Sequence, residues 1–327
     1  MNIKKIGLTA LAGSLIATTT GFAGEMMVSG AAKLSYKALG GTANDTTVEA
    51  GRFAMDQDLS VAGSAELDNG MTISLSHALA AAGGTSDTSS LTLDMGDMGS
   101  ITYNDTDLGN GLRALKDMTP RAYEDAIDSL TDVVAAQMDS GQGFAYNNTV
   151  AGAAVSIVYS DNLGATADRS DGGQDTTSAG AGSSSSIGIT YPVGDTGLTL
   201  FGGTGTVGGV SENTDVDHDT VGLKYAFGPF TGSYQVNETD NDSSSAADLE
   251  STIYGVSMSV NDNLSISYGN HETEKTGTTV DQEAEGFSVA YSMGGMTLSA
   301  FHNDADNVGN TAGQTADATE VVLSFAF

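Results

Sequence analysis

The sequence predicts an all-β chain in which sixteen short strands close into an antiparallel barrel that crosses a membrane. Apolar and polar residues alternate with period two in sixteen segments, an even number. Most of these segments contain about 8–12 residues, which is the length that a tilted strand needs to cross a bilayer. Tight Gly/Asn/Asp turns also alternate with long polar loops along the chain.

The expected strands begin and end at turn residues. They are 27–38, 51–66, 71–79, 91–95, 100–104, 143–150, 153–161, 185–191, 197–204, 220–227, 229–237, 252–260, 264–271, 284–292, 296–303 and 319–327. One face of each strand is apolar, as at Val155 and Ile157, and the other carries small polar residues, as at Ser265 and Ser267. A soluble sandwich would carry Lys and Glu on its polar face, whereas Ser, Thr, Gly and Ala suit a crowded, water-filled interior. In lipid the sheet has to close, because unpaired backbone groups at an edge find no water.

The first 23 residues are typical of a Sec-type signal peptide. Lys4 and Lys5 precede an apolar run, 6–16, that is too short to cross a membrane as a helix. Gly21 and Ala23 are small residues at the positions that signal peptidase reads. We therefore expect cleavage after Ala23 and a single barrel domain over residues 24–327.

The charge of the chain is strongly negative, with 42 acidic and 11 basic residues. Removing Lys4 and Lys5 with the signal peptide leaves nine basic residues in the mature chain. This balance excludes nucleic acid as a natural partner, because like charge repels phosphate. The absence of Cys from the sequence excludes disulfides and thiolate chemistry.

No sequence motif indicates catalysis or a resident cofactor. The string from Gly203 to Gly208 matches the dinucleotide fingerprint, but a polar loop follows it where a helix is required. The run from Asp215 to Asp219 resembles the start of a calcium loop, but Thr220 and Ala226 replace the required Gly and Glu. We expect no enzyme activity, no tightly bound metal and no cofactor, and loosely bound Ca²⁺ on the acidic loops stays open.

One insert, about 104–141, breaks the pattern of strands and predicts a helix over 119–140. Thr119 suits the N-cap and Pro120 the first helical position. Apolar residues then recur at helical spacing, at Tyr123, Ala126, Ile127, Leu130, Val133, Val134 and Met138. The acidic residues Glu124, Asp128 and Asp132 fall on the opposite face, with Asp125 beside them. The prediction is one acidic amphipathic helix.

Together, these features resemble the sixteen-stranded general porins of the Gram-negative outer membrane, most closely the alphaproteobacterial, Rhodobacter-like type. The resemblance rests on the signal peptide, the opening strand MVSGAAKLSY, the rhythm of turns and loops, the oversized third loop and the last strand EVVLSFAF. Phe325 and Phe327 in that last strand look like the signal that the outer-membrane insertion machinery recognises. The resemblance covers the whole mature chain.

The resemblance implies a homotrimer in outer-membrane lipid, with a hydrophilic pore in each protomer and the third loop folded into the barrel as a constriction. It implies that the loop carboxylates face the pore, namely Glu124, Asp125, Asp128 and Asp132. Basic residues would stand on the wall (Lys33, Lys37, Arg52) and in the loop (Arg113, Lys116, Arg121). Asp56 and Asp58 share the face of Arg52, which argues for cation preference.

The expected function is passive diffusion of ions and small hydrophilic solutes across the outer membrane. A solute-selective porin is the first alternative. The second is a surface or adhesion barrel whose acidic loops bind Ca²⁺ or partners. An outer-membrane enzyme has the least support.

Overall fold

The computed structural model describes residues 25–43, 51–80, 86–106, 108–138, 141–160, 183–209, 214–243 and 246–327, so the predicted signal peptide lies outside it. The strands are β1 (Glu25–Gly40), β2 (Arg52–Glu66), β3 (Thr72–Ala80), β4 (Ser86–Asp94), β5 (Ser100–Asn104), β6 (Gly143–Val150), β7 (Ala153–Ser160), β8 (Ser184–Pro192), β9 (Leu198–Val207), β10 (Val216–Phe227), β11 (Phe230–Asn241), β12 (Leu249–Ser259), β13 (Leu264–Lys275), β14 (Gln282–Met293), β15 (Met296–Asp306) and β16 (Thr315–Ala326). Three short 3₁₀ helices are η1 (Gly96–Met98), η2 (Gly111–Leu115) and η3 (Val308–Asn310). Within the described residues, no helix is long and apolar enough to cross a membrane.

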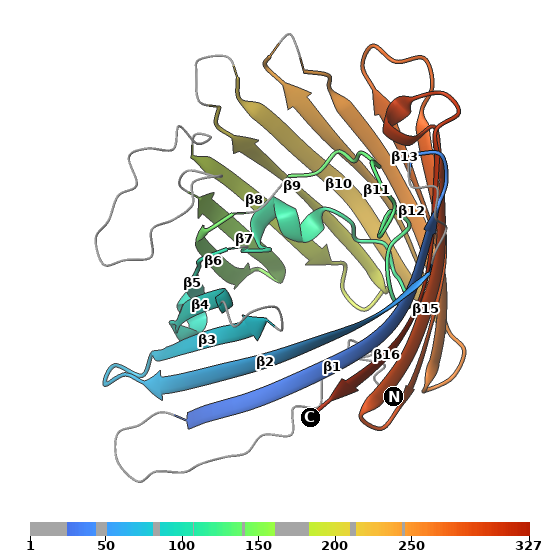
Figure 1. Ribbon diagram of the computed structural model, residues 1–327. Helices are drawn as coiled ribbons and strands as arrows, with labels where there is room; N and C mark the ends of the chain where they lie inside the picture. Colours follow the sequence, from blue (N-terminus) through green and yellow to red (C-terminus); the bar gives the residue numbers. More distant parts are fainter. Residues whose placement is uncertain are drawn as a thin grey trace.

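The strands form one closed antiparallel barrel, as the alternation predicts (Figure 1). Each strand pairs with its neighbours in the sequence, and β1 pairs with β16 to close the ring. Leu34 of β1, for example, lies opposite Leu323 of β16 and Met55 of β2. The chain end takes part in closure, because the N–H groups of Gly30 and Phe327 each donate to the other residue's carbonyl, at 2.8 and 2.9 Å.

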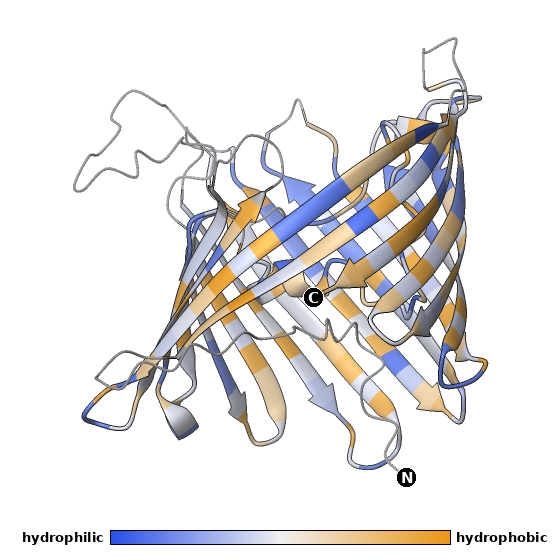
Figure 2. Cartoon of the chain, turned by 60° about the horizontal axis from the view of Figure 1, so that its bottom comes forward, coloured by the Kyte–Doolittle hydropathy of each residue, from blue (hydrophilic) through white to orange (hydrophobic). Residues whose placement is uncertain are grey.

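The alternation of side chains separates an apolar outer face from a polar inner face (Figure 2). Phe53 on β2 is 78% exposed and Tyr254 on β12 is 42% exposed, whereas the inward Ser251 of β12 is fully buried. Successive side chains of a strand point to opposite faces. Large apolar residues therefore collect outside the barrel, and Ser, Thr, Asn and Gln collect inside.

The strands on the β10–β16 side extend further toward the long loops than the sequence pattern predicts. β13 runs to Lys275 and β10 begins at Val216, because the ladders continue through acidic residues. Register places carboxylates opposite one another on the outer face, in the row Asp219, Glu238, Glu250 and Glu274. Like charges in such positions weaken pairing. These side chains are exposed, so water screens the repulsion.

Candidate functional site

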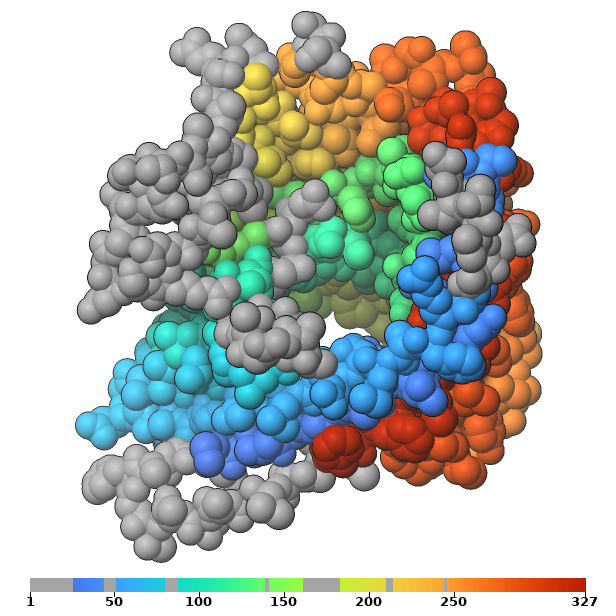
Figure 3. Space-filling view, viewed as in Figure 1, coloured from blue at the N-terminus to red at the C-terminus, as the bar shows by residue number. Residues whose placement is uncertain are grey.

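The chain between β5 and β6, residues 105–142, is the third loop, and its described part lies inside the barrel. Figure 3 shows its teal and green atoms within the ring of strands. Its 3₁₀ helix η2 contacts β7, β8, β9 and β10. The predicted placement of the third loop in the lumen is therefore confirmed.

The predicted helix at 119–140 is wrong. Within the third loop the described residues form one helical turn, η2, and 119–138 run as turns and bends. Ser129 and Asp132 have φ angles of 66° and 58°, which an α-helix does not contain. The physical reason lies in the barrel wall, whose side chains bond to the backbone groups that a helix would pair internally.

Wall side chains accept hydrogen bonds from the backbone N–H groups of the third loop. Ser267 Oγ on β13 accepts from Ala122 N at 2.8 Å, and Ser288 Oγ on β14 accepts from Tyr123 N at 3.1 Å. Further along, Gln282 Oε1 on β14 accepts from Val134 N at 2.9 Å. Because buried backbone groups need partners, these bonds let the loop run along the wall without secondary structure of its own.

Side-chain amides of the wall donate hydrogen bonds to the backbone carbonyl groups of the third loop. Asn237 Nδ2 on β11 donates to Lys116 O at 2.7 Å. Asn303 Nδ2 on β15 donates to both Asp125 O and Asp128 O, at 2.8 and 2.9 Å. We call the inner face of β7–β15, which supplies these partners, the anchoring wall.

Glycines in the anchoring wall make room for the loop. A Cβ on Gly205 would lie 2.7 Å from Met138 Sδ, and one on Gly286 would lie 2.9 Å from Ala126 Cα. The nucleotide-like string that contains Gly205 therefore has a packing role. The predicted packing of the loop's apolar side chains is confirmed as well, because Ile127, Leu130 and Val133 contact the core cluster Ala284, Ala305, Val308 and Ala316.

Three of the four predicted acidic residues come together around one arginine. Arg121 Nη1 lies 3.0 Å from Asp125 Oδ2 and 3.3 Å from Asp117 Oδ2. Asp128 Oδ2 accepts from Asp125 N at 3.1 Å. We call Asp117, Arg121, Glu124, Asp125 and Asp128 the loop charge cluster.

Burial keeps part of this cluster protonated at neutral pH. Desolvation, followed by a hydrogen bond to Asp128 and the charges of Asp128 and Asp125, raises the pKa of Glu124 to about 8. Desolvation, with the charges of Asp128 and Asp117, raises the pKa of Asp125 to about 6, although Arg121 opposes the rise. The carboxylates therefore carry less charge at neutral pH than their number suggests.

Asp132 does not join the loop charge cluster. Its left-handed backbone turns the chain, and it lines a separate cavity of about 500 Å³ with Val308 and Gly309. A helix would have set Asp132 four residues after Asp128 on one face. The turn at Ser129 removes that relation.

The first two strands carry the predicted basic wall residues on their inner face. Lys37 Nζ lies 4.0 Å from Glu320 Oε2 of β16, and Arg52 of β2 lies opposite Lys37 in register. Lys33 faces Asp56 across the same pair of strands. We call the inner face of β1 and β2 the charged wall.

The predicted basic residues of the third loop lie in η2, directly after η2 and in the loop charge cluster. Arg113 in η2 donates from Nη1 to Met138 O at 3.3 Å, and Lys116 follows η2 directly. One basic residue was missed by sequence reasoning, Lys224 on β10. It lies opposite the buried, inward Ser233 of β11, so the alternation of β10 could have identified it. In the described part of the chain, no group of three or more His, Asp or Glu residues is arranged to hold a metal ion.

No protein-family model matches the sequence, and no curated protein matches it with significance. Solved structures do match. A porin refined at 1.8 Å resolution is 15% identical, with a TM-score of 0.66 over 93% of this chain and 100% of the porin chain. An anion-selective porin from Comamonas acidovorans is 13% identical, with a TM-score of 0.65 over 92% of this chain and 99% of its own.

A third similar structure is OmpF of Salmonella typhi in complex with daunomycin. It is 13% identical to this chain, with a TM-score of 0.67 over 93% of this chain and 98% of its own. At such identities the likeness concerns the fold. The chain has the porin fold, a closed barrel of sixteen antiparallel strands.

Proposed function

We propose that this protein is a passive channel of the Gram-negative outer membrane for ions and small hydrophilic solutes. The observation that carries the proposal is a closed barrel whose outer face is apolar and whose polar lumen is narrowed by a loop bonded to the wall. A passive channel needs no moving part and no catalytic group. Ions and small solutes diffuse through the water that a polar lumen holds.

The outer face supports a place in lipid. Exposed apolar side chains surround the barrel, and in water so large an apolar surface would drive association. Phe325 lies in β16 and Phe327 directly follows it, and both point outward, 42% and 63% exposed. We propose that these two residues are read by the outer-membrane insertion machinery, after export by the signal peptide.

We also propose a homotrimer in which the outer face of the first strands contacts neighbouring protomers. Phe53 and Met55 on β2 are 78% and 69% exposed, among the most exposed large apolar side chains described. The outward carboxylate row described above lies on β10–β13, away from these strands. Chemical cross-linking of the detergent-folded chain tests the proposal, which predicts a ladder that ends at three subunits.

The lumen supports a modest cation preference. The loop charge cluster carries four carboxylates and one guanidinium, and Asp56, Asp58 and Glu320 add negative charge on or beside the charged wall. Six further basic residues oppose them, namely Lys33, Lys37, Arg52, Arg113, Lys116 and Lys224. Asp94, Asp97 and Asp132 line cavities of the lumen and add to the acidic side. Because acidic residues outnumber basic ones only slightly, we expect cations to be favoured by a small factor.

Planar-bilayer recording tests both parts of the proposal. The protein should give stepwise conductance, and a chain that inserts without conducting would refute the channel. In a KCl gradient the sign of the reversal potential reports cation preference. The variant Glu124→Gln/Asp128→Asn should shift that potential toward zero, whereas Glu274→Gln, on the outer face, should leave it unchanged.

A further inference from the structure

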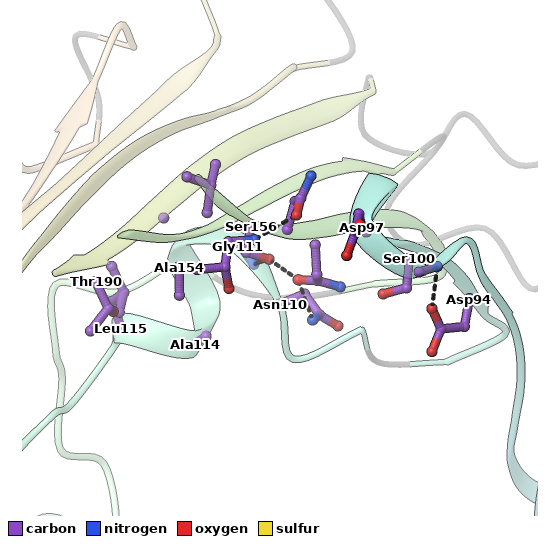
Figure 4. Close-up of a pocket in the computed structure, with 17 residues that line it drawn as sticks. Asp94, Asp97, Ser100, Asn110, Gly111, Ala114, Leu115, Ala154, Ser156 and Thr190 are labelled. Atoms are coloured by element: carbon purple, nitrogen blue, oxygen red, sulfur yellow. Dashed lines mark hydrogen bonds between the residues drawn. The ribbon is translucent and has the colours of Figure 1, made fainter. Parts of the chain in front are cut away.

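A cavity of about 760 Å³ lies between the η1 turn, strands β4–β8 and the start of the third loop (Figure 4). Its volume lies within the range of about 300–1,000 Å³ that small-molecule sites occupy. The cavity is separate from the loop charge cluster, none of whose residues lines it. It is therefore a second feature of the lumen.

One cross-strand row forms the floor of the cavity. Asp94 of β4 lies opposite Ser100 of β5, which lies opposite Asn147 of β6. Asn147 lies opposite Ser156 of β7, and Ser156 lies opposite Gly188 of β8. The floor thus changes across five strands from a carboxylate through hydroxyl and amide groups to a bare backbone.

The third loop covers the Gly188 end of this floor. Gly111 N donates to Ser156 Oγ at 2.9 Å, and Asn110 Nδ2 donates to Asn147 Oδ1 at 3.3 Å. A Cβ on Gly188 would collide with the carbonyl of Gly111, so glycine is required for this close approach. Leu115 and Ala154 make this end of the cavity apolar, as Figure 4 shows.

The opposite end is acidic. Asp94 lies there at the end of β4, and Asp97 lies within η1 in the tight turn that follows. Oδ1 of Asp94 accepts from Gly96 N at 2.9 Å, and within the described residues this bond leaves Oδ2 for a ligand. The described lining contains no basic and no aromatic side chain. Anions are therefore repelled, and neutral rings find no stacking surface.

We propose that this cavity is a binding subsite for small hydroxylated organic ammonium ions of the amino-sugar type. Asp94 and Asp97 would pair with the ammonium group. Ser156 Oγ already donates to Asn147 Oδ1 at 2.6 Å, so the Ser100 hydroxyl and the Asn147 side-chain N–H would bond to hydroxyl groups of the solute. Leu115 and Ala154 would contact the apolar face of the solute. The subsite deepens the proposed channel function and rests on it for its physiological meaning, because the solute reaches the cavity through the lumen.

Direct binding to the detergent-folded full chain tests the subsite without any channel measurement. Isothermal titration calorimetry would compare D-glucosamine hydrochloride with neutral N-acetylglucosamine at about pH 6, where an amine with a pKa of roughly 8 is protonated. Saturable heat from glucosamine alone is expected. Equal binding of both sugars, or loss of the heat when KCl matches the glucosamine concentration, would overturn the proposal.

Variants locate the site. Asp94→Asn/Asp97→Asn should weaken glucosamine binding by roughly tenfold, because two charge-assisted contacts are lost. Asp195→Asn removes an exposed carboxylate from the β8–β9 turn, outside the cavity, and should have no effect. Ala154→Phe fills the apolar end and should also weaken binding. Unchanged affinity in both cavity variants would refute the site.

Conductance then separates the two proposals. If the protein conducts, glucosamine added on the turn side should reduce the current more than N-acetylglucosamine does. If the protein binds glucosamine but does not conduct, the channel proposal fails and the subsite stands. If it conducts but binds both sugars equally or neither, the subsite fails alone.

Discussion

The anchoring wall and the charged wall belong to one barrel and share one alternation of side chains, yet they present different kinds of side chain to the lumen. The anchoring wall presents short neutral groups, such as Ser267, Ser288 and Gln282, and all three bond to the third loop. The charged wall presents Lys33, Lys37 and Arg52 opposite carboxylates or one another.

The difference follows from the cost of burial. A neutral hydroxyl or amide can be buried under a loop when each of its polar groups finds a backbone partner. A lysine or arginine under the same loop would lose its hydration at much greater cost. Charged side chains are therefore expected mainly on the wall that stays in water, and Lys224 of β10 is an exception on the anchoring wall. The third loop is consequently attached on one side of the lumen, and the other side keeps charged side chains in water.

Breaking the anchoring wall should have the largest effect. Gln282 bonds to both the N–H and the C=O of Val134, and Gln235 bonds to Met118 N and Leu115 O. Gln235→Ala/Gln282→Ala leaves these buried groups unpaired at about 1–3 kcal/mol each. The third loop should become sensitive to protease and the open-channel current should become noisy. Ser60→Ala on β2 is the control, and protease resistance equal to wild type would contradict the role of the anchoring wall.

Adding a methyl group to a glycine of the anchoring wall should have a smaller effect. A Cβ on Gly286 would lie 2.9 Å from Ala126 Cα and would also meet the Asn303 side chain, whereas one on Gly269 would lie 3.6 Å from Ala126 Cβ. Gly286→Ala should therefore weaken the attachment of the third loop to the wall by about 1–3 kcal/mol of free energy, and Gly269→Ala should not. Conductance and limited proteolysis against temperature measure the difference. Equal behaviour of the two variants would mean that the loop can shift freely.

Changing the pH should alter the cation preference without a mutation, because it changes the charge of the loop charge cluster. Glu124 and Asp125 have pKa values raised to about 8 and 6, so they gain charge as the pH rises through these values. Cation preference should increase from pH 5 to about pH 9 by a few-fold. A raised carboxyl pKa means that the folded chain holds protons more tightly, so loop attachment weakens over the same rise. Reversal potentials across this range should be flat in Glu124→Gln/Asp125→Asn.

Weakening the charged wall should have the smallest effect. Lys37 is 38% exposed at its side chain and pairs with Glu320 at 4.0 Å, the limit of a salt bridge. Water screens such a pair, so Lys37→Met should raise cation preference by less than about twofold. Lys275→Met, at the loop end of β13, is a matched control that removes a lysine outside the charged wall. A reversal of selectivity by Lys37→Met alone would show that this wall dominates.

The strands were predictable, and the path of the third loop was not. The alternation of apolar and polar residues predicted all sixteen strands, because successive residues of a strand face lipid and water in turn, as Ile157 and Ser156 do. Strand ends near Glu274 were missed because acidic residues look like loop. Lys224 could have been found from the phase of β10. Gln282 could not, because its partner Val134 lies 148 residues away in the sequence.

The sequence by itself determined the closed barrel, its polarity and the presence of an acidic insert, because each of these follows from local alternation and composition. Only the tertiary structure decided the shape of that insert. Helical spacing from Tyr123 to Met138 predicted a helix, but a helix forms where its own hydrogen bonds are the best available. Here Ser, Asn and Gln side chains of distant strands bond to the same N–H and C=O groups. Hydrogen bonds to the wall therefore take the place of the internal hydrogen bonds of a helix. The path that the loop then follows separates Asp132 from the other loop carboxylates.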